Sequence, residues 1–166
     1  MGLAKNFTGR IGRTFEDSEA AWPDLPQPPQ GAPNIVMVLL DDVGYAQFGC
    51  YGSDIATPTF DALAAHGVRY ANFHTTALCS PTRACLMTGR NHHASGMARI
   101  VETASGFPGY DANIPEENGF LPEILVRNGY ATYGLGKWHL APSWEQSPAG
   151  PFDRWPTGLG FDKFYG

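Results

Sequence analysis

CSPTRACLMTGR, residues 79–90, is the stretch around which the rest of the chain is organised. Pro81 fits the first turn of a helix, because the N–H that proline lacks has no helical partner there, and Gly89 fits the left-handed position after a helix end. The pattern predicts a short helix over residues 81–88. Cys79 then lies at the helix N-terminus, where unpaired N–H groups and the helix dipole favour an anion, either a thiolate or a bound oxyanion.

Arg83 follows Cys79 by four residues, so the two side chains project from the same face of the predicted helix. A nucleophile and a cation are thus expected side by side at an anion-binding helix end. A lone cysteine is often only a small buried hydrophobe, and Ser-Pro-Thr-Arg also suits an ordinary helix entry. Taken by itself, Cys79 favours the interpretation as an ordinary small buried residue.

Composition places the chain among globular proteins. It has 166 residues, of which 43% are hydrophobic and 16% charged, enough for one domain with a real core. The net charge of −5 argues against a nucleic-acid partner, since phosphate binding needs a basic surface.

The cysteine content indicates a reducing compartment, and we therefore expect the cytoplasm. The number of cysteines is odd and their spacing is not that of a metal site: Cys50, Cys79 and Cys85. There is no signal-like apolar segment near the start, and the longest apolar run is too short for a membrane span.

Residues 1–33 are polar and then proline-rich, with no sustained period of 3.6 or 2, which predicts an extended N-terminal arm. Its apolar residues fit two fates, docking on a further part of a larger protein or disorder, and the sequence leaves both open. These residues are Phe7, Ile11, Phe15 and Trp22.

Residues 34–40, NIVMVLL, form a continuous aliphatic run that stops at Asp41-Asp42. The run predicts a strand buried on both faces of a parallel sheet. Ligands bind at the carboxyl ends of strands in open α/β sheets, so the acidic pair is a candidate for holding a hard cation through oxygen ligands. Considered in isolation, two adjacent aspartates are more often part of a solvated turn than of a metal site.

Further elements alternate along the chain. Helices are predicted over residues 57–66 and 120–128, and strands over residues 68–73 and 130–136. Residues 102–117 are rich in Gly, Pro and Asn and are predicted to form a loop. Residues 141–166 show no closing element, so the predicted fold is incomplete. The repeated βα pattern indicates an α/β fold, a partial doubly wound, mostly parallel sheet with flanking helices.

Lys137-Trp138-His139 follows the last predicted strand. With a period of two, Lys137 and His139 project from one side while Trp138 faces the other. A surface lysine and a core histidine are the commoner fate of such residues. The position at a strand's carboxyl end nevertheless selects them for the same site as Asp41 and Asp42.

The pattern C-x-P-x-R at residues 79–83, followed by Thr88-Gly89-Arg90, resembles the signature of type I, formylglycine-dependent sulfatases of the alkaline phosphatase superfamily. The likeness to bacterial arylsulfatases covers residues 34–166, with the acidic pair, GKWH at residues 136–139 and GFDKFYG at residues 160–166 in family order. The resemblance implies that residues 34–166 are the N-terminal portion of a sulfatase catalytic domain.

By this resemblance, Asp41, Asp42 and the modified Cys79 would ligate Ca²⁺ or Mg²⁺. A formylglycine-generating enzyme would oxidise Cys79 to Cα-formylglycine, whose hydrate is the nucleophile toward a small sulfate ester. The remaining roles follow the same likeness: Arg83 would hold and polarise the nucleophile, His139 would hydrogen-bond one of its hydroxyls, and Lys137 would grip the sulfate and stabilise charge on the leaving side.

The resemblance also implies further metal ligands and cations beyond residue 166, in a C-terminal half that this chain lacks. We therefore expect the isolated chain to be weakly active or inactive as a sulfuric ester hydrolase. Two alternatives stay open. One is a phosphonate or phosphate monoester hydrolase of the same superfamily, and the other is a non-catalytic truncated remnant.

Overall fold

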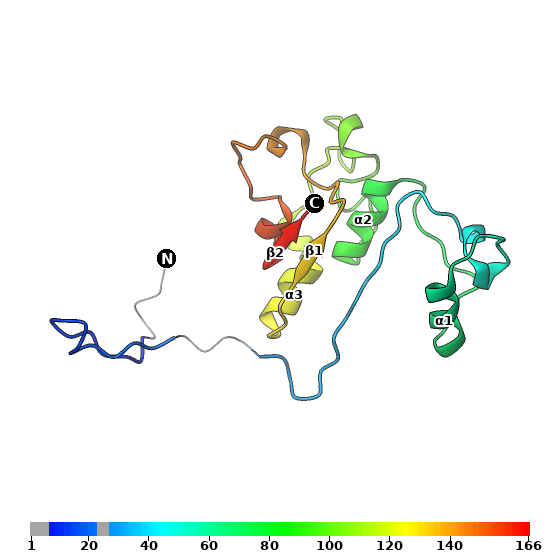
Figure 1. Cartoon of the computed structure of the whole chain (residues 1–166). Coiled ribbons are helices and arrows are strands. Elements are labelled where there is room, and N and C mark those ends of the chain that lie inside the picture. The colour runs from blue at the N-terminus through cyan, green and yellow to red at the C-terminus, as the bar shows by residue number, and fades with distance from the viewer. Residues whose placement is uncertain (1–6, 23–26) are drawn as a thin grey trace.

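The computed structural model describes residues 7–22 and 27–166. Figure 1 shows α2, α3 and the strands gathered together and α1 to one side. The helices are α1 (Pro58–His66), α2 (Cys79–Thr88) and α3 (Leu121–Arg127), and the strands are β1 (Tyr133–Leu135) and β2 (Lys163–Tyr165). Short 3-10 turns lie between them: η1 (Tyr45–Gln47), η2 (Gly49–Tyr51), η3 (Val101–Thr103), η4 (Glu116–Asn118), η5 (Ser143–Glu145) and η6 (Pro156–Leu159).

The helices form where local start and stop signals predict them, and all three predictions are confirmed. A proline occupies the first turn of α1 and of α3. α2 begins at Cys79, two residues before the predicted start, so Pro81 still lies in its first turn. Gly89 ends α2 in the left-handed region, with φ of 66°, and donates its N–H to the Cys85 carbonyl at 2.8 Å.

The two strands run parallel, with Tyr133 opposite Lys163 and Leu135 opposite Tyr165. β1 lies inside the strand predicted over residues 130–136. β2 was not predicted: residues 141–166 contain this three-residue strand, where no helix or strand was expected. The Asp162 carboxylate accepts a hydrogen bond from the Thr132 N–H at 2.8 Å and so ties together the two segments that lead into the strands. The parallel pairing of β1 and β2, together with the helices α1, α2 and α3, gives the α/β class.

The strands predicted over residues 34–40 and 68–73 are wrong. Neither segment is assigned as a strand, and neither pairs with a strand in the described part of the chain. Val36 is 86% exposed, where burial on both faces of the strand was expected, and Val68 in the second segment is 82% exposed. An apolar run of this kind becomes a buried strand only when neighbouring strands and covering helices are present, and the described sheet consists of β1 and β2.

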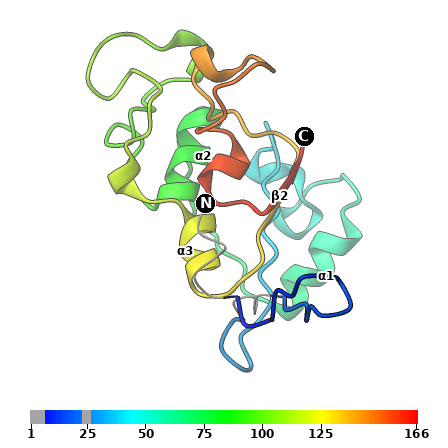
Figure 2. The same cartoon turned by 90° about the vertical axis from the view of Figure 1, so that its left-hand side faces the viewer.

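The core lies under α2 and η3 and beside the segment that follows β1. Figure 2 shows α2 and α3 next to each other. The buried hydrophobic residues come from well-separated segments: Ala84, Met97, Val101, Ala112, Ile114, Phe120, Leu140 and Leu159. Trp138 packs against this cluster and donates its indole N–H to the Arg154 carbonyl at 3.2 Å. The backbone on either side of this tryptophan is therefore held in place by the core.

Residues 7–22 of the predicted arm fold back on themselves through an antiparallel bridge between Arg10 and Glu19. The apolar side chains Ile11, Phe15 and Trp22 are 85–91% exposed. Residues 1–6 and 23–26 of the arm lie outside the described residues. Within the two described ranges, no helix combines the length and the apolar character that a membrane crossing requires.

Candidate functional site

A hollow of about 450 Å³ lies beside the N-terminus of α2. It is lined by the segment around Asp41 and Asp42, by residues 75–79, and by Thr82 and Arg83. The helix signals described above place Cys79 in the first turn of α2 and Arg83 one turn later, on the side that faces this hollow. The structure thus brings the acidic pair next to the C-x-P-x-R segment, although residues 34–40 form no strand.

Arg83 joins three parts of the chain. It is 9% exposed, donates to the Lys137 carbonyl at 2.6 Å and forms an ion pair with Asp41 at 3.3 Å. The Lys137 ammonium group contacts the other oxygen of Asp41 at 2.9 Å. One carboxylate therefore pairs with two cations. Arg83 Nε is buried and has no hydrogen-bond partner within the described residues, which leaves one donor of this cation unused.

His139 bridges Cys79 and Glu102. Its Nδ1 lies 3.2 Å from Cys79 Sγ, and its Nε2 lies 2.8 Å and 2.9 Å from the two carboxylate oxygens of Glu102. The His139 side chain is 15% exposed, whereas that of Glu102 is 57% exposed. A thiol, an imidazole and a carboxylate thus form a continuous row of polar contacts at the helix end.

The predicted alternation of Lys137-Trp138-His139 is present in space. Lys137 and His139 reach the site, while Trp138 packs on the core. The three residues follow β1 rather than ending it, because Gly136, with φ of 85°, turns the chain after Leu135. Among the described non-glycine residues, Asp42 and His139 are two of the three with positive φ, at 53° and 58°. Backbone in this region costs energy, and it is often retained where a side chain must be aimed.

Charge pairing shifts the pKa values of three groups. The hydrogen bond from Lys137 lowers the pKa of Asp41, with Arg83 adding to it, and burial opposes the change. The same hydrogen bond raises the pKa of Lys137. Burial acts to raise the pKa of Glu102, but a backbone hydrogen bond and the hydrogen bond from His139 together lower it. The site therefore holds ionised carboxylates and an ionised lysine at neutral pH.

Asp41 and Asp42 offer the carboxylate oxygens that Ca²⁺ and Mg²⁺ prefer. Both residues line the hollow, but Asp41 is already paired with Lys137 and Arg83. Among the described residues, no three His, Cys, Asp or Glu side chains form a group able to hold a metal ion. The donors fit such a cation in kind but not in number, since calcium takes about six to eight oxygen ligands.

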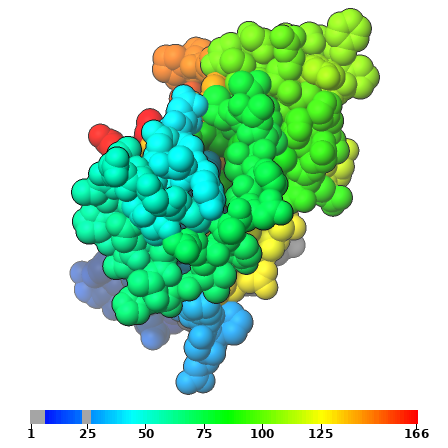
Figure 3. All heavy atoms as spheres, turned by 90° about the vertical axis from the view of Figure 1, so that its right-hand side faces the viewer, coloured from blue at the N-terminus to red at the C-terminus, as the bar shows by residue number. Residues whose placement is uncertain are grey.

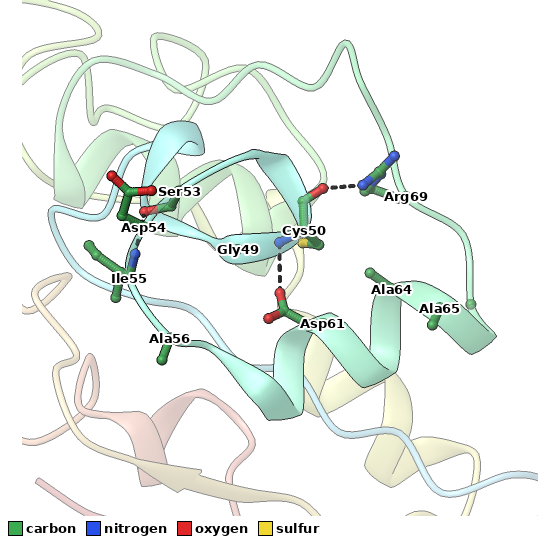
Figure 4. A pocket seen from close by; sticks show the side chains of 11 residues that line it. Gly49, Cys50, Ser53, Asp54, Ile55, Ala56, Asp61, Ala64, Ala65 and Arg69 are labelled. Atoms are coloured by element: carbon green, nitrogen blue, oxygen red, sulfur yellow. Dashed lines mark hydrogen bonds between the residues drawn. The ribbon is translucent and has the colours of Figure 1, made fainter.

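A second hollow, of about 810 Å³, lies between η2, α1 and Arg69 (Figure 4). Its polar groups bind one another, because Asp61 accepts the Cys50 N–H at 2.7 Å and Arg69 donates to the Cys50 carbonyl. Figure 3 shows η1, η2 and α1, in cyan to blue-green, as a lobe beside α2. Since Arg69 and Asp61 of this hollow are taken up by backbone groups, the hollow at α2 is the better candidate site.

Sequence reasoning did not select Glu102, which the structure places against His139. The residue lies at the start of the segment predicted to be a loop, 37 positions before His139, and no local motif marks it. The sequence held one weak signal for Glu102, its position in the segment that follows the helix carrying Arg83. The other predicted site residues gather at α2: Cys79, Arg83, Lys137, His139 and Asp41 make contacts there, and Asp42 lines the same hollow.

Comparison with known proteins gives a consistent family. A family model described as Sulfatase matches residues 33–166. The chain is 40% identical over 136 residues to human arylsulfatase A, 38% over 137 to human steryl-sulfatase, and 38% over 140 to an uncharacterized sulfatase of Schizosaccharomyces pombe. These alignments cover 80–81% of this chain and 23–25% of each relative.

A structural match agrees with the sequence matches. The crystal structure of Ps i-CgsB resembles this chain with a TM-score of 0.55 and 32% sequence identity, over 75% of this chain and 25% of that one. The chain spans about a quarter of the length of the curated relatives it matches. The family model covers far more than half of the residues, so the chain belongs to the sulfatase family.

Proposed function

We propose that this chain supplies the nucleophile segment of an enzyme that hydrolyses sulfate esters, with Cys79 converted to Cα-formylglycine. The observation that carries the proposal is the gathering of Cys79, Arg83, Lys137 and His139 at the start of α2. These residues come from the C-x-P-x-R and GKWH motifs, which lie 54–60 positions apart in the sequence. The named arylsulfatase and steryl-sulfatase relatives support the same reaction class.

The cations of the site suit a sulfate ester. Such an ester carries negative charge that repels a nucleophile, and Arg83 and Lys137 offset this charge in a partly buried position. Arg83 holds the oxygen nucleophile formed from Cys79, and Lys137 binds the sulfate oxygens and the developing charge on the leaving alcohol. Attack at sulfur forms the new oxygen–sulfur bond and breaks the bond to the alcohol. Covalent catalysis of this kind divides one difficult step into two.

His139 serves the second step. When the remaining hydroxyl on the modified Cys79 gives its proton to His139 Nδ1, the aldehyde forms again and sulfate leaves with the electron pair of its bond to carbon. The 3.2 Å contact between Nδ1 and Sγ places the imidazole within reach of a group attached at this position. A serine in place of Cys79 has no second hydroxyl and would remain sulfated.

We propose that Ca²⁺ or Mg²⁺ binds at Asp41 and Asp42 together with the modified Cys79. Bound there, the cation would supply positive charge beside the sulfate. The donors among the described residues are too few for a complete site, so we assign further oxygen ligands to a C-terminal part of the sulfatase. For the same reason we expect the 166-residue chain to have weak activity or none until that part is added.

We propose that residues other than Arg83, Lys137 and His139 select the alcohol of the ester. Similar proteins differ in this respect, since their names include arylsulfatase and steryl-sulfatase, and one similar structure is a complex with k-i-k-neocarrahexaose. Arg83, Lys137 and His139 would contact the nucleophile and the sulfate group, and the sulfate group is common to all such esters.

We further propose a cytoplasmic location. The three free thiols Cys50, Cys79 and Cys85 support it, and cell fractionation tests it.

Mass spectrometry of the peptide that spans Cys79 tests the modification. After co-expression with a formylglycine-generating enzyme, we expect the thiol to be replaced by an aldehyde, and Pro81→Ala or Arg83→Ala to reduce the conversion. Cys85→Ser is the matched control, because Cys85 lies on the same helix outside the motif. A thiol at Cys79 in the native host would remove the proposed nucleophile.

Turnover tests the reaction. A sulfatase completed with its C-terminal part should hydrolyse an aryl sulfate, and Cys79→Ala should abolish this activity. Faster turnover of a phosphonate monoester would assign the site to that substrate class instead. A non-catalytic remnant is tested on the chain alone, where a cooperative unfolding transition with a calcium-dependent midpoint would contradict it.

A further inference from the structure

We propose that Glu102 is a positioning residue, which fixes the tautomer and the orientation of His139 toward the nucleophile at position 79. The inference deepens the proposed function and rests on it for its catalytic meaning. The contact itself is a property of the fold, because it joins a 3-10 turn that precedes α3 to the segment that follows β1. It can therefore be tested without any turnover.

The geometry of the row is specific. Both Glu102 oxygens lie within 2.9 Å of His139 Nε2, and the opposite ring nitrogen, Nδ1, lies 3.2 Å from Cys79 Sγ. The imidazole is thus held at both of its nitrogens. Its side chain is 15% exposed, so water has little access to compete for these positions.

The backbone on each side of this contact is fixed by the core. Glu102 is the middle residue of η3, and the preceding Val101 is 1% exposed. The Thr103 N–H donates to the Ile100 carbonyl at 3.1 Å and closes the turn. Glu102 is therefore a half-exposed side chain on a rigid base.

His139 is held in the same way. Arg83 binds the carbonyl of Lys137 at 2.6 Å, and Leu140, directly after His139, is 2% exposed. Between these two points the His139 backbone adopts φ of 58°, which L-residues rarely occupy. This conformation turns the ring toward Cys79 and Glu102, and the two hydrogen-bonding partners then hold the ring in that position.

A carboxylate determines which nitrogen of a neutral imidazole carries the proton. A neutral imidazole has one N–H donor and one acceptor, and an ionised carboxylate only accepts. Glu102 therefore holds the proton on Nε2, which leaves the Nδ1 lone pair directed at position 79. The same principle orients the histidine of nucleophile–base–carboxylate triads on unrelated folds.

This assignment gives Glu102 a defined effect in the proposed reaction. As sulfate leaves, an O–H bond on the modified Cys79 breaks, its proton binds Nδ1, and its electron pair forms the carbonyl double bond. The Nε2–H remains donated to Glu102, which stabilises the imidazolium that results. A histidine with its proton on Nδ1 would be unable to accept this proton.

The first experiment is ¹⁵N NMR of the 166-residue chain labelled at histidine, near pH 8, where imidazole is mostly neutral. His139→Asn assigns the resonances. We expect His139 to show a protonated Nε2 and an unprotonated Nδ1. In Glu102→Gln the side-chain amide can donate a hydrogen bond to Nε2. Part of the population should therefore carry the histidine proton on Nδ1 instead of Nε2. Glu117→Gln, an exposed change in η4, should leave His139 unchanged.

Three results would overturn the proposal. The first is a wild-type chain with the proton of His139 on Nδ1, a measurement that needs no variant to fold. The second is a folded Glu102→Gln chain whose His139 tautomer matches the wild type. Glu102→Asp keeps the carboxylate and should keep the Nε2–H form, so a loss of this form in Asp as well as in Gln would also contradict tautomer control by charge.

The second experiment measures kcat and KM in the completed, formylglycine-bearing sulfatase. Glu102→Gln should lower kcat by about 10²-fold with KM little changed, the size of effect expected from a misdirected general base, and Glu102→Asp should recover part of it. A fall in kcat without a tautomer change would contradict the positioning role. An inactive wild type would count against the proposed sulfatase function alone, because the NMR comparison still decides the role of Glu102.

Discussion

Arg83 is the residue on which the site's geometry depends most directly. It is nearly buried and joins α2 to the Lys137 carbonyl and to Asp41 with two different nitrogens of its guanidinium group. A lysine has one ammonium group and cannot reach both acceptors in this fixed geometry. Because hydrogen bonds to charged groups are worth about 1.5–3 kcal/mol, we expect Arg83→Lys to lower the free energy of unfolding by about 1–3 kcal/mol.

Urea unfolding of the chain measures this effect. Arg90→Lys, an exposed change two residues after the end of α2, is the matched control and should lie within about 0.5 kcal/mol of the wild type. Equal stability of the two variants would mean that the bridge from α2 to Lys137 contributes nothing to folding.

The pairing of Asp41 with Lys137 predicts a pH dependence of stability. The pKa of Asp41 is lowered in the folded chain and that of Lys137 is raised. The stabilisation is therefore fully present above the ordinary pKa of Asp and below that of Lys. It is lost as pH falls through the lowered pKa of Asp41, below about pH 4, and as pH rises through the raised pKa of Lys137, above about pH 10.

Asp41→Asn removes this contribution. The difference in unfolding free energy between wild type and variant should be constant near neutral pH and shrink in acid. Asp54→Asn, an exposed acid between η2 and α1, gives the comparison series. An undiminished difference at pH 3 would show that Asp41 stabilises the chain by something other than its charge.

Residue types and their local spacing predicted much of the site. Cys79 and Arg83 share one helix, so their proximity follows from a four-residue interval. Lys137 and His139 were selected by alternation, and they do flank a tryptophan that packs against the core. Glu102 was not predictable in this way, because its partner lies 37 residues away and only the folded chain brings the two together.

At the scale of elements, the end of α2 depends on one glycine. Gly89 has φ of 66°, and a Cβ added there would meet no atom within 4 Å. The cost of Gly89→Ala is therefore conformational and not steric, and we expect a loss of about 1–2 kcal/mol in unfolding free energy. Gly106→Ala is the matched control, since that position is equally open but lacks a positive φ.

Thermal or urea unfolding of both variants measures the difference. Gly106→Ala should be neutral or slightly stabilising, because alanine restricts the unfolded chain. If both variants lose the same stability, the left-handed helix end has no special role. A loss at Gly89 should also appear as fraying at Thr88, whose hydroxyl donates to the Ala84 carbonyl at 2.7 Å.

Helices and strands differed in how well the sequence predicted them. The three helices carry their own start and stop signals, so their bounds agree within two residues. Strands need partners that the local sequence does not specify. Residues 34–40 have a strand pattern but no partner in the described sheet, whereas β2 is three residues long and pairs with β1 because Asp162 fixes its approach. The alternation Lys163-Phe164-Tyr165 was a signal that could have indicated β2.

At the scale of the whole molecule, the lack of a strand partner for residues 34–40 in the described sheet leaves apolar surface exposed. The side chains of residues 35–40 are 39–86% exposed. The run has high β-propensity and contains no charge, proline or glycine. Such a segment pairs readily with another extended chain. We therefore expect the 166-residue chain to self-associate through residues 35–40, with an apparent mass that rises with concentration in light scattering.

Substituting Val36→Lys and Val38→Lys tests this expectation, because both residues are at least 65% exposed and neither belongs to the buried core. The double variant should shift the chain toward monomer and change the unfolding free energy by no more than about 0.5 kcal/mol per site. Ile11→Lys, at a position 85% exposed in residues 7–22, is the control and should leave association unchanged.

If residues 35–40 instead pair with the C-terminal part of the sulfatase, adding that part to the wild type should dissolve the oligomers. The double variant should then bind it more weakly. Self-association that persists in the double variant would place the contact on another surface.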